Sequence, residues 1–206
     1  MDLRLFCNRT LCVVGPSHAD KSTFVLQLLD NRNEMFTCVP NRVVWCYDIY
    51  QHDLNVQLTQ KGFITHSDII AVSDIQPYNI IVLDNLIHES KNSSDVTSMF
   101  TRATHYKPCF IIFIMHNLFP SGCEARTRSL NTYYCCIFKT PREKSQVEFL
   151  AWQILPHNPK ALIEVFEATT EKPHSYLFLD LTQVSGAVPL SEQSFWQTYD
   201  YFQVAK

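Results

Sequence analysis

The sequence predicts an α/β fold in which a mostly parallel sheet carries helices on both faces. Two observations support this prediction. Short apolar runs alternate with stretches of helical spacing along the 206 residues. The apolar runs are rich in Val, Ile, Phe, Tyr and Cys and are nearly continuous, which is typical of strands that are buried on both faces. We expect one domain over residues 1–206, with about 8 N-terminal and about 20 C-terminal residues peripheral to it.

The expected elements follow these patterns along the chain. The apolar runs predict strands at Thr10–Val14, Val43–Tyr47, Ile80–Leu83, Phe110–Met115, Tyr133–Phe138 and Tyr176–Leu179. The intervening stretches predict helices at Lys21–Asp30, Ser94–Thr104, Lys144–Leu155 and Pro159–Thr169. Within the second of these helices, apolar residues recur at helical spacing at Val96, Met99, Phe100 and Ala103. In such a sheet, a ligand binds at the carboxyl ends of the strands.

Composition limits the function classes. The chain is 46% hydrophobic and 18% charged, which indicates a folded protein. Its net charge of −3 gives no overall nucleic-acid signature, so a DNA contact would need a local patch or subunits around a pore. The start MDLRLFCNR is short and broken by charge, so we expect no signal peptide, and no apolar run approaches the roughly 20 residues that span a membrane. We therefore expect an intracellular protein with no membrane partner.

The eight cysteines contain no Cys-x-x-Cys pair. Five of them lie inside apolar runs, where free cysteine behaves as a small hydrophobic residue: Cys12, Cys46, Cys109, Cys135 and Cys136. We therefore expect neither a disulfide framework nor a zinc site, and we expect a reducing compartment.

The segment Leu11–Thr23, LCVVGPSHADKST, is nearly the phosphate-binding pattern Gly-x-x-x-x-Gly-Lys-Ser/Thr. One position departs from it, because Asp20 replaces the second glycine. An apolar strand precedes the segment and a helix pattern follows it, as a P-loop NTPase requires. The alternative is an ordinary strand–loop–helix with an incidental Lys-Ser-Thr. The expected nucleotide contacts are Gly15, Pro16, Ser17, His18, Ala19, Asp20, Lys21, Ser22 and Thr23.

The spacing of this loop suits a nucleotide triphosphate. Its backbone N–H groups would surround the phosphates, and the next helix adds its positive N-terminal end. Lys21 would reach the β- and γ-phosphates, and Ser22 would hold Mg²⁺. Asp20 brings a Cβ atom and a negative charge toward this anion. It is tolerable if its φ is positive, since Asp is among the better non-glycine residues there, and if its carboxylate turns to solvent.

The run Ile80–Leu83 ends at Asp84, as a Walker B strand does. Asp84 would complete the Mg²⁺ site opposite Ser22; the alternative is an ordinary strand-end or capping Asp. The next position, often a water-activating acid in additional-strand ATPases, is Asn85, which can orient water but cannot take its proton. Glu89 could serve only if the backbone turns it back, and a solvated Glu89 is the alternative.

Two further segments could complete the site. The strand Phe110–Met115 ends at His116 and Asn117, either of which could sense the γ-phosphate or hold the attacking water; the alternative is a loop cap. Arg126 and Arg128 could supply an arginine finger across a subunit interface. Their alternative is a solvent-facing basic turn.

The run from Phe110, FIIFIMHNLFPSGCEARTRSLNTYYCCIFKTPREKSQ, resembles viral genome-packaging ATPases of the FtsK/HerA branch. The most specific parts are Asn-Leu-Phe, Arg-Thr-Arg-Ser-Leu-Asn and Phe-Lys-x-Pro-Arg-x-Lys-Ser-Gln. The nearest similarity is to the poxvirus-type packaging ATPases of polinton or Maverick elements and adintoviruses, over about residues 9 to 183.

This resemblance implies an ATPase of the additional-strand P-loop type that forms a homo-oligomeric ring and pumps double-stranded DNA into a capsid. Its cofactors would be ATP and Mg²⁺, and its partners DNA and capsid or portal proteins. It would work in the host nucleus or at an assembly site, or on the virion. The roles carried over are phosphate and Mg²⁺ binding for Lys21 and Ser22, the Walker B acid for Asp84, the sensor for Asn117, where the family has Gln-Asn, and the finger for Arg126 or Arg128.

Two departures from the family leave other functions open. Asp20 and Asn85 replace a glycine and an acid, which suggests slow hydrolysis or a nucleotide-binding subunit without hydrolysis. A P-loop small-molecule kinase is a third candidate, although another buried strand follows its only lid-like segment, around Arg126 and Arg128. Lys139, Arg142 and Lys144 could track DNA phosphates around a pore, or could be a solvated loop.

Overall fold

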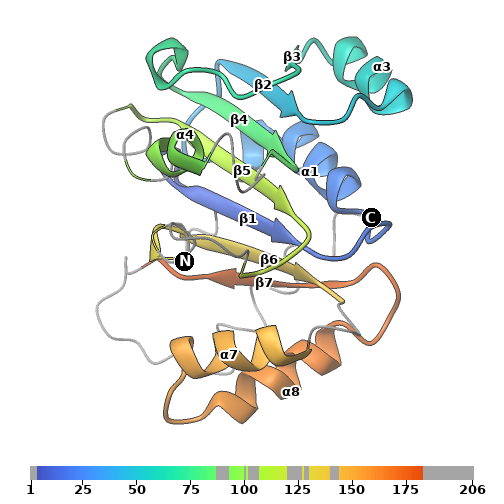
Figure 1. Cartoon of the computed structure of the whole chain (residues 1–206), viewed down its shortest axis with the longest axis vertical. Coiled ribbons are helices and arrows are strands. Elements are labelled where there is room, and N and C mark those ends of the chain that lie inside the picture. Colours follow the sequence, from blue (N-terminus) through green and yellow to red (C-terminus); the bar gives the residue numbers. More distant parts are fainter. Residues whose placement is uncertain are drawn as a thin grey trace.

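A computed structural model describes residues 4–86, 93–99, 101, 107–119, 127, 130–139 and 144–182. These residues form one seven-stranded sheet in the order β3-β2-β4-β5-β1-β6-β7 (Figure 1). Its strands are β1 Thr10–Val14, β2 Arg42–Tyr47, β3 Ile64–His66, β4 Asn79–Asp84, β5 Phe110–Met115, β6 Tyr134–Phe138 and β7 Tyr176–Asp180. Every neighbouring pair is parallel except β6 and β7, which are antiparallel.

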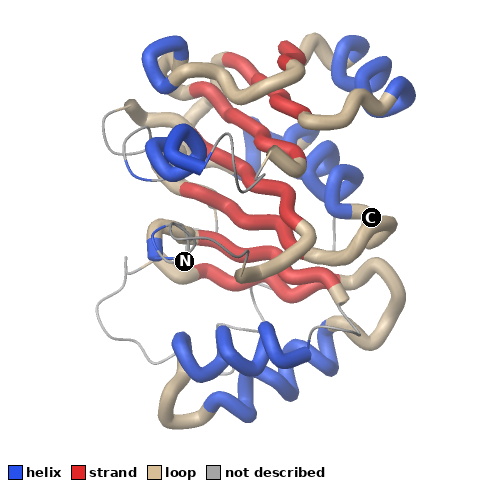
Figure 2. The backbone as a smooth tube through the Cα atoms, in the orientation of Figure 1, coloured by secondary structure: helices blue, strands red, loops and turns tan. Residues whose placement is uncertain are grey.

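Helices and loops connect these strands, as Figure 2 shows. The helices are α1 Lys21–Asp30, α2 Arg32–Met35, α3 His52–Gln60, α4 Ser93–Ser98, α7 Lys144–Ile154 and α8 Pro159–Thr169, with a 3-10 turn at Val72–Asp74. Among the described residues, none of these helices has the length and apolar character that a membrane crossing needs.

The sheet separates two apolar cores. On one face, α1 and α3 cover strand residues such as Val13, Trp45 and Ile112. On the other face, α4, α7 and α8 cover residues such as Val14 and Phe113. Strands buried on both faces account for the continuous apolar runs in the sequence, because every side chain of such a strand meets a protein interior.

The strand order confirms the predicted fold class. Strand β5 lies between β1, which leads to the phosphate loop, and β4, which ends at Asp84. This is the arrangement of an additional-strand P-loop fold. The bounds of β1, β5, α1 and α8 match the predicted ranges, whereas α3 and β3 were not predicted. Residues 100 and 102–104 of the predicted helix Ser94–Thr104 lie outside the described residues.

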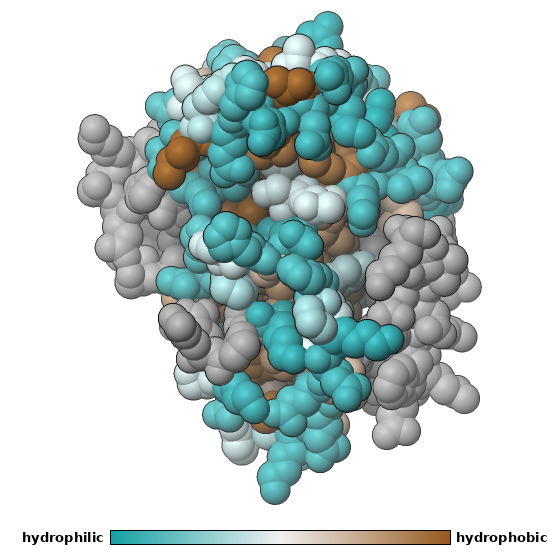
Figure 3. All heavy atoms as spheres, turned by 90° about the vertical axis from the view of Figure 1, so that its right-hand side faces the viewer, coloured by the Kyte–Doolittle hydropathy of each residue, from teal (hydrophilic) through white to brown (hydrophobic). Residues whose placement is uncertain are grey.

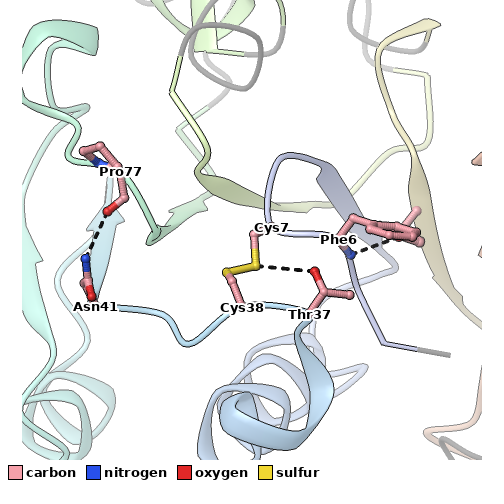
Figure 4. Close-up of a disulfide and its surroundings, with 7 residues drawn as sticks. Phe6, Cys7, Thr37, Cys38, Asn41 and Pro77 are labelled. Atoms are coloured by element: carbon pink, nitrogen blue, oxygen red, sulfur yellow. Dashed lines mark hydrogen bonds between the residues drawn. A yellow bond between two sulfur atoms is a disulfide. The ribbon is translucent and has the colours of Figure 1, made fainter. Parts of the chain in front are cut away.

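The expectation about disulfides was wrong for one pair, because Cys7 and Cys38 form a disulfide (Figure 4). A short backbone pairing brings them together: the N–H of Leu5 donates to the Met35 carbonyl at 2.8 Å, and that of Thr37 to the Leu5 carbonyl at 2.9 Å. The two Cα atoms are then 6.1 Å apart, within bonding range. The five cysteines of the apolar runs are buried, and none of them forms a disulfide within the described residues.

Candidate nucleotide-binding site

The predicted phosphate loop lies where β1 ends, at the edge formed by the carboxyl ends of the parallel strands. Figure 3 looks onto this side of the molecule, and its surface is largely hydrophilic. Residues 15–20 connect β1 directly to α1. Among them Gly15 is buried, Ala19 is half-buried, and Pro16, Ser17 and His18 are exposed.

Position 15 requires glycine because the chain passes close to Phe138 there. A Cβ atom at this position would lie 2.7 Å from the Cβ of Phe138 on β6 and 3.4 Å from that of Ala19. The Gly15 N–H donates to the Met115 carbonyl at 3.3 Å, which ties the start of the loop to the end of β5. The loop is therefore seated on its two neighbouring strands.

Asp20 takes the left-handed backbone that the motif normally assigns to glycine. Its φ is 63° and its ψ is 27°, so the predicted condition of a positive φ is confirmed. Its carboxylate is 54% exposed and lies 3.0 Å from Nδ1 of His174. Although Asp20 is the N-cap residue of α1, its side chain makes no capping hydrogen bond within the described chain.

Lys21 is only 6% exposed, which is rare for a lysine. Its Nζ donates to the carbonyls of Gly15 and Pro16, both at 2.8 Å. The ammonium therefore sits inside the loop. Burial lowers the pKa of Lys21, and the nearby charge of Asp84 opposes that shift. The next residues, Ser22 and Thr23, are half-buried and exposed.

Asp84 ends β4 and is also 6% exposed. It alternates with Val82, which belongs to the core on the α1 face, so its side chain lies on that face of the sheet. Burial raises its pKa, and Trp45 and the Lys21 charge lower it. The Trp45 indole N–H lowers the pKa of Asp84 although it forms no hydrogen bond of standard geometry with any described residue.

The donors available for a magnesium ion fit its chemistry. Mg²⁺ prefers oxygen ligands, usually one or two from the protein with the rest from water and phosphate. The Ser22 hydroxyl and the Asp84 carboxylate would hold it here. Ser22 follows Lys21 directly in the chain, and Asp84 is close enough to Lys21 for their charges to interact.

Asn85 follows Asp84 in a left-handed conformation with a φ of 57°. Its N–H donates to the Ile114 carbonyl at 3.2 Å, which fixes its backbone against β5. Glu89, the acid offered as a distant substitute, lies outside the described residues, as do Arg126 and Arg128.

The two polar residues after β5 occupy different positions. Strand alternation puts His116 on the α1 face with Ile112 and Ile114, and Asn117 on the other. Burial and the Lys21 charge lower the pKa of His116, while a hydrogen bond to the Gly15 backbone opposes the shift. Both residues are exposed, and of the two it is His116 that interacts with Lys21 and with the Gly15 backbone.

Sequence reasoning missed the roles of Trp45 and His174. Trp45 sits in an apolar run and carries no polar signal. His174 lies 154 positions from Asp20, the residue it contacts, and no local motif marks it. The basic residues Lys139 and Lys144 are exposed; Lys139 donates to the Glu171 carbonyl at 2.8 Å, and Lys144 lies 3.0 Å from Glu167. Arg142 lies outside the described residues.

No family model and no curated protein matches the sequence. Solved structures do match. The genome packaging NTPase B204 of Sulfolobus turreted icosahedral virus 2, in complex with sulfate, superposes with a TM-score of 0.56 at 11% identity, covering 88% of this chain and 95% of that one. Its complex with ATP-gammaS gives 0.55 at 10% identity, covering 88% and 96%.

The DNA-packaging ATPase B204 of Sulfolobus turreted icosahedral virus gives a TM-score of 0.56 at 9% identity, covering 86% of this chain and 94% of that one. At such identities the likeness establishes the fold and nothing finer. The chain therefore has the mostly parallel α/β fold of P-loop NTPase structures, over nearly the whole length of the viral proteins it matches.

Proposed function

We propose that this chain is an ATPase that drives double-stranded DNA into a viral capsid. The observation that carries the proposal is the buried pair of Lys21 and Asp84 beside the loop that matches the phosphate-binding motif. The structural likeness to genome-packaging NTPases supports it. A homo-oligomeric ring, capsid or portal partners, the FtsK/HerA branch and work inside the host cell belong to the same proposal.

The loop would bind the nucleotide through groups that are already in position. Lys21 is held at the loop by two carbonyl oxygens, so its charge is in place before phosphate arrives. A buried ammonium interacts with an anion more strongly than one in water. Mg²⁺, when bound by Ser22 and Asp84, would neutralise charge on the phosphate oxygens.

Hydrolysis needs a group that orients the attacking water and one that takes its proton. Asn85 can orient water. His116 has a lowered pKa, so its imidazole is neutral near pH 7 and can accept a proton. Its position beside Lys21 and Gly15 supports a role close to the γ-phosphate. Asn117, Glu89, Arg126 and Arg128 remain candidates for sensing, proton transfer and the arginine finger.

A nucleotide-binding subunit without hydrolysis is the second candidate, and Asn85 favours it. The Asn85 amide accepts no proton from water, and the Asn85 backbone is fixed against β5 by its hydrogen bond to Ile114. In that case ATP would bind and stabilise the fold without turnover. A P-loop small-molecule kinase would instead need a phosphate acceptor.

The test is ATP turnover of the purified protein, with and without linear double-stranded DNA, for wild type, Lys21→Ala and Lys61→Ala. Lys61 is a matched control because its ammonium pairs with Asp30 at the far end of α1, at 2.7 Å. Turnover that rises with DNA and disappears only in Lys21→Ala supports the motor.

Other outcomes separate the alternatives. ATP binding that depends on Lys21, with no turnover, supports the non-hydrolysing subunit. Turnover that requires a small phosphate acceptor supports the kinase. If wild type and Lys21→Ala both fail to bind ATP, the proposal is overturned, and the loop is a relic on an intact fold.

A further inference from the structure

Asp20 creates a specific problem for a phosphate site. An aspartate at a helix N-cap normally accepts hydrogen bonds from the N–H groups of the first turn. Those same N–H groups would bind phosphate in this loop. A capping Asp20 would therefore fill the anion site with its own carboxylate, and its charge would repel the nucleotide.

The carboxylate of Asp20 is turned elsewhere. It makes no capping hydrogen bond among the described residues, and it contacts Nδ1 of His174 at 3.0 Å. A nitrogen that close to a carboxylate oxygen carries the proton and donates it. The contact orients the carboxylate away from the α1 N–H groups.

The fold holds His174 in this position. His174 lies in the loop that enters β7, on the same side of the molecule as the phosphate loop (Figure 1). Two residues later, the Tyr176 ring packs against Phe24 of α1, with centroids 4.8 Å apart. Phe24 in turn donates its N–H to the Asp20 carbonyl at 2.9 Å. His174 itself has a φ of 63°, a costly conformation that persists where the surroundings enforce it.

We propose that His174 is a positioning residue for nucleotide binding, which keeps the Asp20 carboxylate off the phosphate site. The inference rests on the proposed function, since it presumes that the loop binds nucleotide phosphates. In this chain the pair of Asp20 and His174 takes the place of the second glycine of the motif.

The experiment is a double-mutant cycle on the dissociation constant for Mg-ATP, measured by calorimetry. His174→Asn and His174→Asp are compared in the wild-type and Asp20→Gly backgrounds, with Lys21→Ala as the non-binding control. Asn carries a donor nitrogen on Cγ, as His does in Nδ1, and tolerates a positive φ. Asp at position 174 has nearly the same shape as Asn, but its carboxylate would repel the carboxylate of Asp20.

We expect His174→Asp to weaken ATP binding by about 5-fold or more with Asp20 present, as for a like-charge contact near the surface. His174→Asn should stay within about 2-fold of wild type, because it retains the donor. In the Asp20→Gly background, both variants should bind equally. The 5-fold difference should shrink in high salt, since the pair is exposed.

Equal effects of His174→Asp in both backgrounds would overturn the inference, because they would indicate a role independent of Asp20. Wild-type protein that binds no ATP while Asp20→Gly binds it would also overturn the inference, but would leave the proposed nucleotide site standing. If no variant binds ATP, the proposed function fails and the inference fails with it.

Discussion

Gly15→Ala tests whether the seat of the phosphate loop is as tight as the structure indicates. The new Cβ would lie 2.7 Å from the Cβ of Phe138, and this separation must grow by about 0.7 Å to reach the 3.4 Å of ordinary contact. Phe138 cannot yield easily, because its Cβ is part of β6 and its ring packs against Tyr176 at a centroid distance of 5.3 Å. The loop must move instead.

Overpacking of this kind costs about 1–3 kcal/mol. For a chain of this length, 2 kcal/mol corresponds to a fall in Tm of roughly 4–8 °C. A displaced loop also misplaces Lys21, whose Nζ bonds to the Gly15 carbonyl, so the dissociation constant for Mg-ATP should rise at least about 10-fold.

The assay is thermal unfolding combined with calorimetric ATP binding. Gly62→Ala is the matched control, since Gly62 has a φ of +73° and, its chain neighbours apart, no described residue has an atom within 4 Å of the added Cβ. It should lose about 1–2 kcal/mol through backbone strain alone and keep its ATP affinity. A Gly15→Ala protein with wild-type Tm and ATP affinity would refute the argument from the 2.7 Å contact.

Three further predictions follow. Asn85→Asp keeps a residue that tolerates the left-handed backbone and supplies the missing acid, so steady-state ATP turnover should rise about 10-fold or more; an unchanged rate would exclude a catalytic role for this position. The pKa of His116 in the folded protein is lowered from 6.5, so the folded protein holds this proton less tightly than the unfolded chain does. The stability of the protein is therefore unaffected by His116 above pH 6.5 and decreases as pH falls from 6.5 through the lowered pKa. The urea midpoint of wild type should therefore fall more steeply below pH 6.5 than that of His116→Asn, and parallel profiles would contradict the assignment. Cys7→Ser opens a link across a sequence separation of 31, which should cost about 3–4 kcal/mol in urea unfolding and leave ATP affinity unchanged; equal midpoints for oxidised wild type and the variant would argue against the disulfide.

The fold could be predicted largely because its strands are buried on both faces. Such strands produce apolar runs that end where the strand ends, as at Val14 and Met115. The missed elements lack this signal. Helix α3 buries only Asn55 and Leu58, so its sequence reads as polar. Strand β3 has three residues at the edge of the sheet, and Ile64 is 40% exposed.

In the candidate site, contacts that follow from local motifs could be predicted, whereas contacts between distant segments could not. The proximity of Lys21 and Asp84 could be predicted, because each lies at a fixed position in a motif that follows a buried strand. The partners of Asp20 and Cys7 could not, since these contacts span 154 and 31 positions and depend on which segments the sheet brings together. Which of His116 and Asn117 lies on the α1 face depends on how β5 is oriented in the sheet, which the sequence leaves open.

The reversed direction of β7 changes which part of the chain can reach the phosphate loop. A parallel strand contributes the residues that leave its carboxyl end, whereas β7 contributes the loop that enters it, between α8 and Tyr176. The position of the loop at residues 15–20 thus depends on the length and sequence of a connection from a helix that packs on the opposite face of the sheet to α1. A change in the length of that connection, such as an insertion after α8, would therefore reach Asp20 through His174, although α8 itself packs on the other face of the sheet.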